Sequence, residues 1–286
     1  SSPATTDPPA VAETDRPAPP VSETPEPPAP ESPAPAASDP PPSPASAPEE
    51  TAQPAPENDD TPSPAPVGEL AFNGIDESSS AVLPATEDMG QDYIDRIIFL
   101  GDSTTYGMKY YRMLTDGRDT KQVWTPTSGT LTLSYQSFAD IWYPDDGTEI
   151  PIRDAVQKKQ PEYMIITLGV NGVSFMDEDY FKSEYTDLVT GIQQASPDTK
   201  IILQSIFPVA SNYEYQGSIN NEKINQANQW VLEVAESTGV RYLNTCTVLI
   251  GSDGYMVSSY QNGDGLHLNE TGFGLVLDYI RTHAYP

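Results

Sequence analysis

Residues 97–105 read IIFLGDSTT, and this stretch indicates how the chain folds. Residues 97–101 are apolar throughout instead of alternating between apolar and polar side chains, which is typical of a strand buried on both faces of a parallel sheet. A serine follows this strand at a predicted turn from strand to helix. Because the ligand sites of open parallel sheets lie beyond the carboxyl ends of the strands, the same stretch predicts where a functional site would lie.

The apolar pattern of residues 97–101 recurs four times along the chain. Further apolar runs at 122–125, 163–169, 200–206 and 240–244 predict four more strands. Apolar spacing and stop signals predict amphipathic helices at 180–195, 219–238 and 270–283. The alternation of strands and helices predicts an α/β fold, namely a three-layer α/β/α sandwich around a doubly wound, five-stranded parallel sheet. Residues 126–160 form a long connection without a clear prediction.

The first 66 residues differ in composition from the rest of the chain. They carry 22 of the 30 prolines and no aromatic residue, and they consist mostly of Ala, Ser, Thr, Asp and Glu besides proline. Such a segment cannot bury enough apolar surface to offset the entropy of ordering it, so we expect residues 1–66 to be a disordered acidic tether or linker. Residues 67–96 are predicted to be an irregular lead-in, and residues 97–286 a single domain. A tether fits an extracellular or surface-attached protein, and an ordinary interdomain linker is the alternative.

Charge and hydropathy argue against two classes of partner. The formal net charge is −28, of which five Asp, eight Glu and one Arg in residues 1–70 supply −12 and residues 71–286 supply −16. This acidity argues against nucleic acid as a partner, since phosphate binding needs basic patches. No apolar run approaches the roughly 20 residues of a transmembrane helix, although anchoring through a segment before residue 1 stays open. Cys246 is the only cysteine, and nothing in the sequence indicates an oligomeric state.

Side chains with catalytic potential follow the predicted strands. Ser103 follows the first strand, Gly129 the second and Asn171 the third, and Asp264 and His267 stand three residues apart before the last helix. Each of them alone has a simpler explanation as a helix cap or a turn residue. Because the carboxyl ends of parallel strands meet at one edge of the sheet, we expect all five to lie at the same site.

Taken together, these residues predict a serine hydrolase. Ser103 attacks an acyl carbon only if a base removes its proton, and His267 is the candidate because His283 lies on a helix tail near the C-terminus. Asp264 would fix the tautomer of His267 and stabilise the imidazolium. The backbone N–H groups of Ser103 and Gly129 and the side-chain amide of Asn171 would bind the oxyanion of the tetrahedral intermediate.

The segments GDST, SGT, GVN and DGLHLN, in this order, resemble the four sequence blocks of the SGNH hydrolase superfamily, also called GDSL esterases and lipases. The resemblance covers roughly residues 95–284. It implies a flavodoxin-like sandwich, the same roles for the five residues, and no metal or cofactor. The chain departs from the family at Gly172, where the third block often has an aspartate.

The sequence leaves the substrate open, because the four blocks are common to enzymes of many esters. The tether favours a small acyl group, such as an O-acetyl group on a carbohydrate or cell-wall polymer. Six aromatic residues near the blocks would either stack on sugar rings or belong to the core: Tyr106, Tyr110, Tyr111, Trp124, Trp142 and Tyr143. An O-acyltransferase with the same triad and a non-catalytic carbohydrate-binding module on the same fold are the alternatives.

Overall fold

The central sheet has five parallel strands. The computed structural model describes residues 73–286, so the predicted tether at 1–66 lies outside the described residues. The strand order is β2-β1-β5-β6-β7, with β1 at Ile97–Gly101, β2 at Val123–Trp124, β5 at Tyr163–Thr167, β6 at Lys200–Gln204 and β7 at Arg241–Leu243. Numbered within the sheet this is the order 2-1-3-4-5 of flavodoxin-like folds. The predicted fold class is therefore confirmed.

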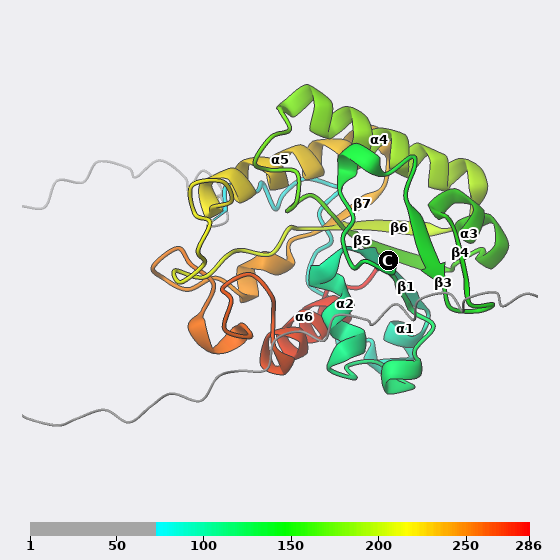
Figure 1. Cartoon of the computed structure of the whole chain (residues 1–286), viewed down its shortest axis with the longest axis horizontal. Helices are drawn as coiled ribbons and strands as arrows, with labels where there is room; N and C mark the ends of the chain where they lie inside the picture. Colours follow the sequence, from blue (N-terminus) through cyan, green and yellow to red (C-terminus); the bar gives the residue numbers. More distant parts are fainter. Residues whose placement is uncertain (1–72) are drawn as a thin grey trace, which may run out of the picture. The chain divides into compact units, whose positions relative to one another are not determined.

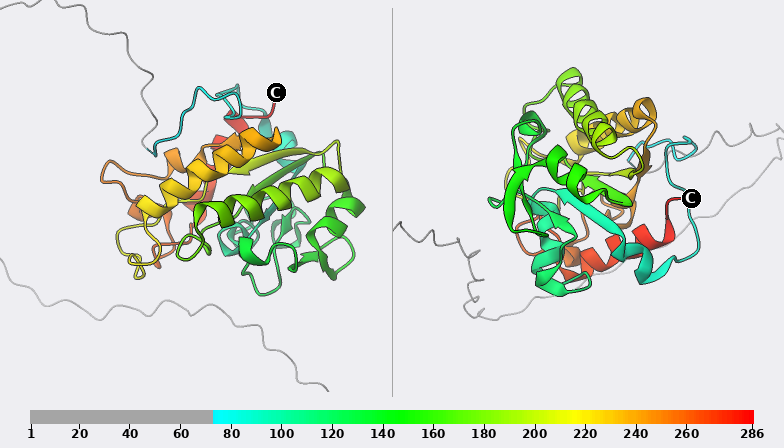
Figure 2. Two further views of the ribbon diagram at one scale, coloured as in Figure 1. Left: turned by 90° about the horizontal axis from the view of Figure 1, so that it is seen from above. Right: turned by 90° about the vertical axis from the view of Figure 1, so that its right-hand side faces the viewer.

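Helices cover both faces of this sheet (Figures 1 and 2). One face carries α3 (Ile152–Lys159), α4 (Glu178–Ala195) and α5 (Asn221–Thr238), and the other carries α1 (Gly90–Asp95), α2 (Ser103–Tyr110) and α6 (Glu270–Thr282). Alternate residues of β1 belong to the two hydrophobic clusters: Ile98 and Leu100 face α3–α5, whereas Ile97 and Phe99 face α1, α2 and α6. Coverage on both faces explains why the strand has no polar side.

The predicted helices agree with α4, α5 and α6 to within two residues at each end. Their ends follow ordinary capping chemistry. The Asp177 side chain accepts from the N–H of Tyr180 at the start of α4, and Asn220 accepts from Lys223 at the start of α5. Gly239 ends α5 with a left-handed φ of 75°. The strand β1 has the predicted bounds, whereas β2, β5, β6 and β7 are shorter than predicted, because buried residues continue beyond the ends of these strands.

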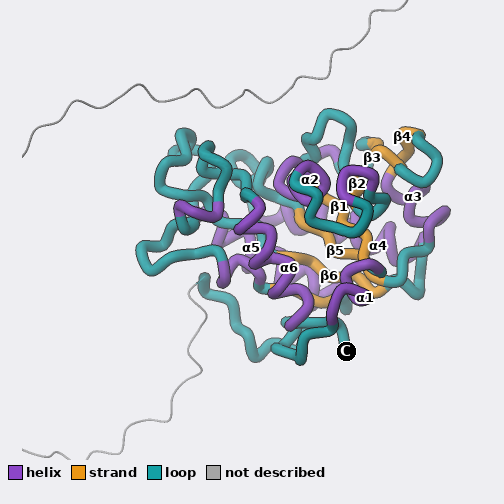
Figure 3. Tube along the Cα trace, turned by 90° about the horizontal axis from the view of Figure 1, so that it is seen from below, coloured by secondary structure: helices purple, strands orange, loops and turns teal. Residues whose placement is uncertain are grey.

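Two segments contain structure that the sequence did not predict. Within the unassigned connection lie an antiparallel hairpin of β3 (Asp140–Tyr143) and β4 (Thr148–Pro151) and then α3. In the lead-in, α1 forms just before β1, and Figure 3 shows it beside α6. Both helices are short, so neither presents enough turns for an apolar period to stand out.

Among the helices of residues 73–286, none is long and apolar enough to cross a membrane.

Candidate active site

Ser103 lies at the carboxyl end of β1, as the first residue of α2. Asp102 caps this helix: its Oδ1 accepts from the backbone N–H of Thr104 at 2.9 Å and from the Thr104 hydroxyl at 2.6 Å. Gly101 allows the first turn of α2 to pack closely on the end of β1, because a Cβ at this position would collide with the Thr105 side chain. The end of β1 and this cap together fix the position of the Ser103 backbone, from which the hydroxyl projects.

A chain of two hydrogen bonds joins Ser103 to His267 and Asp264. The Ser103 Oγ lies 2.9 Å from Nε2 of His267, and Nδ1 of the same ring lies 2.6 Å from Oδ2 of Asp264. With the ring proton on Nδ1, the imidazole donates to the carboxylate and its Nε2 accepts from the serine hydroxyl. This arrangement can move a proton away from the serine oxygen.

The loop before α6 holds Asp264 by its own backbone. Asp264 Oδ1 accepts from the N–H of Leu266 at 2.8 Å and from that of His267 at 2.9 Å. Partial burial raises the pKa of Asp264, but the hydrogen bonds from the His267 ring and from these two N–H groups outweigh it and lower the pKa to about 2. Asp264 is therefore ionised at neutral pH and favours a proton on the facing ring nitrogen.

A second loop, between β6 and α5, supports the first. Gly265 has a φ of +82°, and a Cβ there would come within 2.6 Å of the Tyr213 backbone nitrogen. The backbone N–H of Ala210 donates to the Gly265 carbonyl at 2.8 Å, and the Asn212 amide donates to the Gly263 carbonyl at 3.0 Å. The position of Asp264 thus depends on this close approach.

The three predicted oxyanion donors follow strands at the same edge of the sheet, and they differ in whether their N–H groups are already hydrogen-bonded. The N–H of Ser103 stands at a helix start, where such groups lack intrahelical partners. The Asn171 amide donates to the carbonyl of Leu131 at 3.2 Å, which leaves its second N–H for a ligand. The N–H of Gly129 donates to the Pro126 carbonyl at 2.8 Å, so it would have to leave that turn before it could bind an oxyanion.

The other histidine is remote from this arrangement. His283 follows the last residue of α6, about 20 Å along the helix from its first turn. Its ring stacks on Tyr279 at 3.7 Å, and burial lowers its pKa. The prediction that His283 is not the base agrees with this position, although its ring is packed rather than fully solvated.

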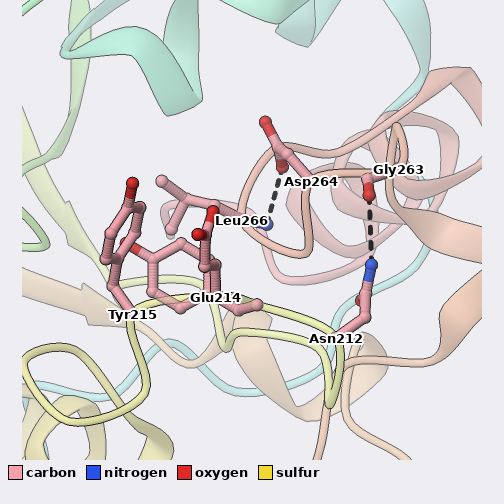
Figure 4. Close-up of a pocket in the computed structure, with 7 residues that line it drawn as sticks. Asn212, Glu214, Tyr215, Gly263, Asp264 and Leu266 are labelled. Atoms are coloured by element: carbon pink, nitrogen blue, oxygen red, sulfur yellow. Dashed lines mark hydrogen bonds between the residues drawn. The ribbon is translucent and has the colours of Figure 1, made fainter. Parts of the chain in front are cut away.

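A pocket of about 380 Å³ lies beside Asp264. Its walls come from the loop between β6 and α5 and from the loop before α6. In Figure 4 the side chains of Glu214, Tyr215 and Leu266 lie together beside Asp264. The motifs gave no signal for Glu214 or Tyr215. Only their position after β6, at the carboxyl edge of the sheet, could have predicted from the sequence that they lie near the site.

The six aromatic residues near the motifs divide between core and surface. Trp124 and Tyr143 are buried and pack edge to face. Tyr106 and Tyr110 of α2 are exposed, and Tyr111 and Trp142 are intermediate. The core explanation holds for two of the six, so only part of this set is available to a substrate.

The described part of the chain contains no group of His, Cys, Asp and Glu side chains that could hold a metal ion.

Comparison with known proteins identifies relatives of this chain. The model of the GDSL-like lipase/acylhydrolase family matches residues 99–275. Among solved structures, a GDSL-like lipase from Bacteroides thetaiotaomicron is 19% identical, with 66% of this chain and 87% of that chain covered and a TM-score of 0.47. A lipase/acylhydrolase from Enterococcus faecalis is 17% identical (65% and 93% covered, TM-score 0.42), and an acetyl xylan esterase is 16% identical (64% and 96%, TM-score 0.46). No curated protein sequence matches the chain. These structural likenesses identify no substrate.

Proposed function

Since the chain belongs to the GDSL-like lipase/acylhydrolase family and is an ester-hydrolysing enzyme, we propose that it works through an acyl-enzyme on Ser103, with His267 and Asp264 completing a catalytic triad. The observation that carries this proposal is the chain of hydrogen bonds from the Ser103 hydroxyl through the His267 ring to Asp264, at 2.9 and 2.6 Å. All three side chains come from loops or helix starts at the carboxyl edge of one sheet.

In the first half of the reaction, Ser103 Oγ attacks the acyl carbon while its proton passes to Nε2 of His267. The carbonyl oxygen becomes an oxyanion, which the Ser103 N–H and the free N–H of the Asn171 amide can bind. Gly129 adds a third donor if its N–H leaves the Pro126 carbonyl. The imidazolium then gives its proton to the departing alcohol, and the acyl group stays on Ser103.

In the second half, water replaces the alcohol. His267 takes a proton from the water as it attacks the acyl carbon, and the same proton then goes to Ser103 Oγ when the acyl–oxygen bond breaks. The products are a carboxylic acid and the free enzyme. Asp264 keeps the ring in one tautomer in both halves and stays ionised throughout.

We further propose a small acyl group, such as acetyl, on a carbohydrate or cell-wall polymer as the substrate. Exposed aromatic side chains on segments that follow the strands support this proposal: Tyr106, Tyr135, Phe138, Phe175 and Tyr215. Aromatic faces suit stacking on sugar rings. The pocket beside Asp264 adds polar groups from Asn212 and Glu214, which suit the hydroxyl groups of a sugar better than a long acyl chain.

An extracellular or surface-attached location is part of this proposal. It rests on the composition of residues 1–66, which carry 22 of the 30 prolines and are acidic. A tether of this kind would let the domain reach a polymer at some distance from an anchor.

Hydrolysis of p-nitrophenyl acetate tests the role of Ser103. Ser103→Ala should lower kcat by roughly 10⁶ and leave the circular dichroism spectrum unchanged, because the nucleophile is lost and the fold is not. Ser252→Ala, at an exposed serine that forms no hydrogen bond with the triad, should keep the parent rate. A Ser103→Ala protein with the parent activity would show that another group forms the acyl-enzyme.

Acetate release from acetylated polysaccharides tests the substrate proposal. The parent should release acetate from at least one acetylated glycan, with a higher kcat/KM than from p-nitrophenyl acetate. Transfer of the acetyl group to an added sugar, in place of release, would favour the acyltransferase alternative. Activity restricted to long-chain esters would rule out the carbohydrate proposal while keeping the triad.

A further inference from the structure

Two buried polar atoms near Ser103 have no hydrogen-bond partner in the described residues. They are Oδ2 of Asp102 and Nε1 of Trp124, and both side chains are fully buried. One is an acceptor and the other a donor. Buried polar groups without partners are rare in native proteins, because each loses its hydrogen bonds to water without replacement. Such a pair calls for an explanation.

The sheet places the two side chains on the same face. Leu100 of β1 is the register partner of Trp124 in β2, and both belong to the hydrophobic cluster that faces α3–α5. Asp102 comes two residues after Leu100 and has an extended backbone, with φ −105° and ψ −156°. Side chains two residues apart along extended chain share a face, so Asp102 lies diagonally across from Trp124.

The geometry points to a buried polar link between the Asp102 carboxylate and the Trp124 indole N–H, made through one bridging water, that positions the Ser103 turn against the loop carrying Gly129. Each end of this link is attached to a part of the candidate active site. Asp102 directly precedes Ser103, and Trp124 directly precedes the segment that leads to Gly129. Asp102 and Trp124 are thus positioning residues, since neither side chain reaches a substrate.

The charge of Asp102 supports the link. Burial raises the pKa of Asp102 to about 6, and the hydrogen bonds from Thr104 oppose this shift without cancelling it. The titratable groups that interact electrostatically with Asp102 are Tyr185 of α4 and His267 of the loop before α6. No salt bridge of the described residues includes Asp102. A carboxylate in this state gains most from a further donor, which a water held by the indole N–H supplies.

Fluorescence of Trp124 tests the link without any measurement of activity. Replacing the other two tryptophans, Trp142→Phe and Trp230→Phe, leaves Trp124 as the reporter. Its emission should show a single step near pH 6, because the Asp102 end of the link changes from carboxylate to carboxylic acid. The step should disappear in Asp102→Asn and persist in His267→Gln. Emission that is flat across this range, or a step that survives Asp102→Asn, would overturn the inference.

Kinetics test the positioning role, and this part rests on the proposed function of Ser103. With p-nitrophenyl acetate, Asp102→Asn and Trp124→Phe should each lower kcat about tenfold, less than the 10²–10³ lost with an oxyanion donor, with little change in KM. The double variant should be no slower than the worse single variant, because both remove one link. Trp230→Phe, a change of the same size on α5, should keep the parent kcat. Losses that multiply in the double variant would show that the two residues act separately. Loss of activity in Ser103→Ala with no coupling between the pair would leave the triad standing and reject the link alone.

Discussion

Two aspartates are connected to Ser103 in different ways: Asp102 precedes it in the chain, and Asp264 is linked to its hydroxyl through the His267 ring. Asp102 is fully buried, and its pKa rises to about 6 because burial disfavours the charged form. The Asp264 side chain is 47% exposed, and its pKa falls to about 2, since hydrogen bonds from His267 and Leu266 outweigh its partial burial. The same functional group thus serves as a structural cap in one place and as a fixed negative charge in the other. What differs is the number of N–H donors that face it and its access to water.

The two aspartates should differ most in how much their replacement lowers the rate of the reaction. Asp264→Asn should lower kcat by roughly 10⁴, because the amide cannot stabilise the imidazolium and favours the wrong tautomer of His267. Asp102→Asn should lower it only about tenfold, since Asn still caps α2 and the relay stays in place. Steady-state kinetics with p-nitrophenyl acetate measure both. Equal losses in the two variants would mean that Asp102 takes part in the proton relay, and the distinction between them would fail.

The sequence predicted much of this site for a physical reason. Parallel strands with apolar side chains throughout must end at a common edge, so Ser103, Asn171 and His267 could be expected at that edge from their positions alone. The close pairing of Asp264 with His267 followed from their spacing of three residues. The apolar pattern of each strand and the three-residue spacing of Asp264 and His267 can both be recognised in local sequence.

The parts that the sequence did not predict depend on contacts between distant segments. The burial of Asp102 arises only in the folded domain, where its charge couples to Tyr185 of α4, and nothing in GDST distinguishes a buried cap from an exposed one. The turn that occupies the Gly129 N–H depends on the fold of residues 126–160, which have no clear apolar period. The loop with Glu214 and Tyr215 is near the site because Gly265 allows a close approach, which sequence spacing does not reveal.

Stability against pH should separate the two aspartates by sign. The folded protein holds the Asp102 proton more tightly than the unfolded chain, whose pKa is near 3.8. Stability from this group is therefore complete below about pH 4 and is lost as the pH rises through about 6. Asp102→Asn has no such ionisation. Its free energy of unfolding relative to the parent should rise by up to about 3 kcal/mol between pH 4 and pH 8, since two pKa units correspond to that amount. Urea unfolding at a series of pH values measures it, and a constant difference would contradict the shifted pKa.

The two aspartates also differ in what holds them, and Gly265 tests that difference. Asp102 is fixed by a buried helix start, whereas Asp264 depends on a loop whose Gly265 touches the Tyr213 backbone. Gly265→Ala should cost about 2 kcal/mol of stability, from a left-handed φ and this contact, and should also lower kcat because Asp264 moves.

Gly239→Ala is the matched control for Gly265→Ala. Gly239 has a φ of +75°, close to the +82° of Gly265, but nothing lies within 4 Å of a Cβ there. This variant should lose about 1 kcal/mol, because alanine adopts a left-handed φ only at a cost, and it should keep the parent kcat. Thermal unfolding and kinetics of the two variants separate backbone strain from loop displacement. A parent-like kcat in Gly265→Ala would show that the loop does not set the position of Asp264.

The smallest expected effect is the contribution of Asp264 to stability in acid, and its sign is opposite to that of Asp102. The pKa of Asp264 is lowered to about 2 in the folded protein, so the folded state favours the ionised carboxylate. The stability from this group is present above about pH 4 and is lost as the pH falls towards 2. Because the side chain is nearly half exposed, solvent screens the interaction and the change should stay below about 1 kcal/mol. The free energy of unfolding of the parent minus that of Asp264→Asn should therefore decrease on acidification, whereas the corresponding difference for Asp102→Asn should increase. If both differences moved in the same direction, the direction of the pKa shift would be wrong for at least one of the two carboxylates.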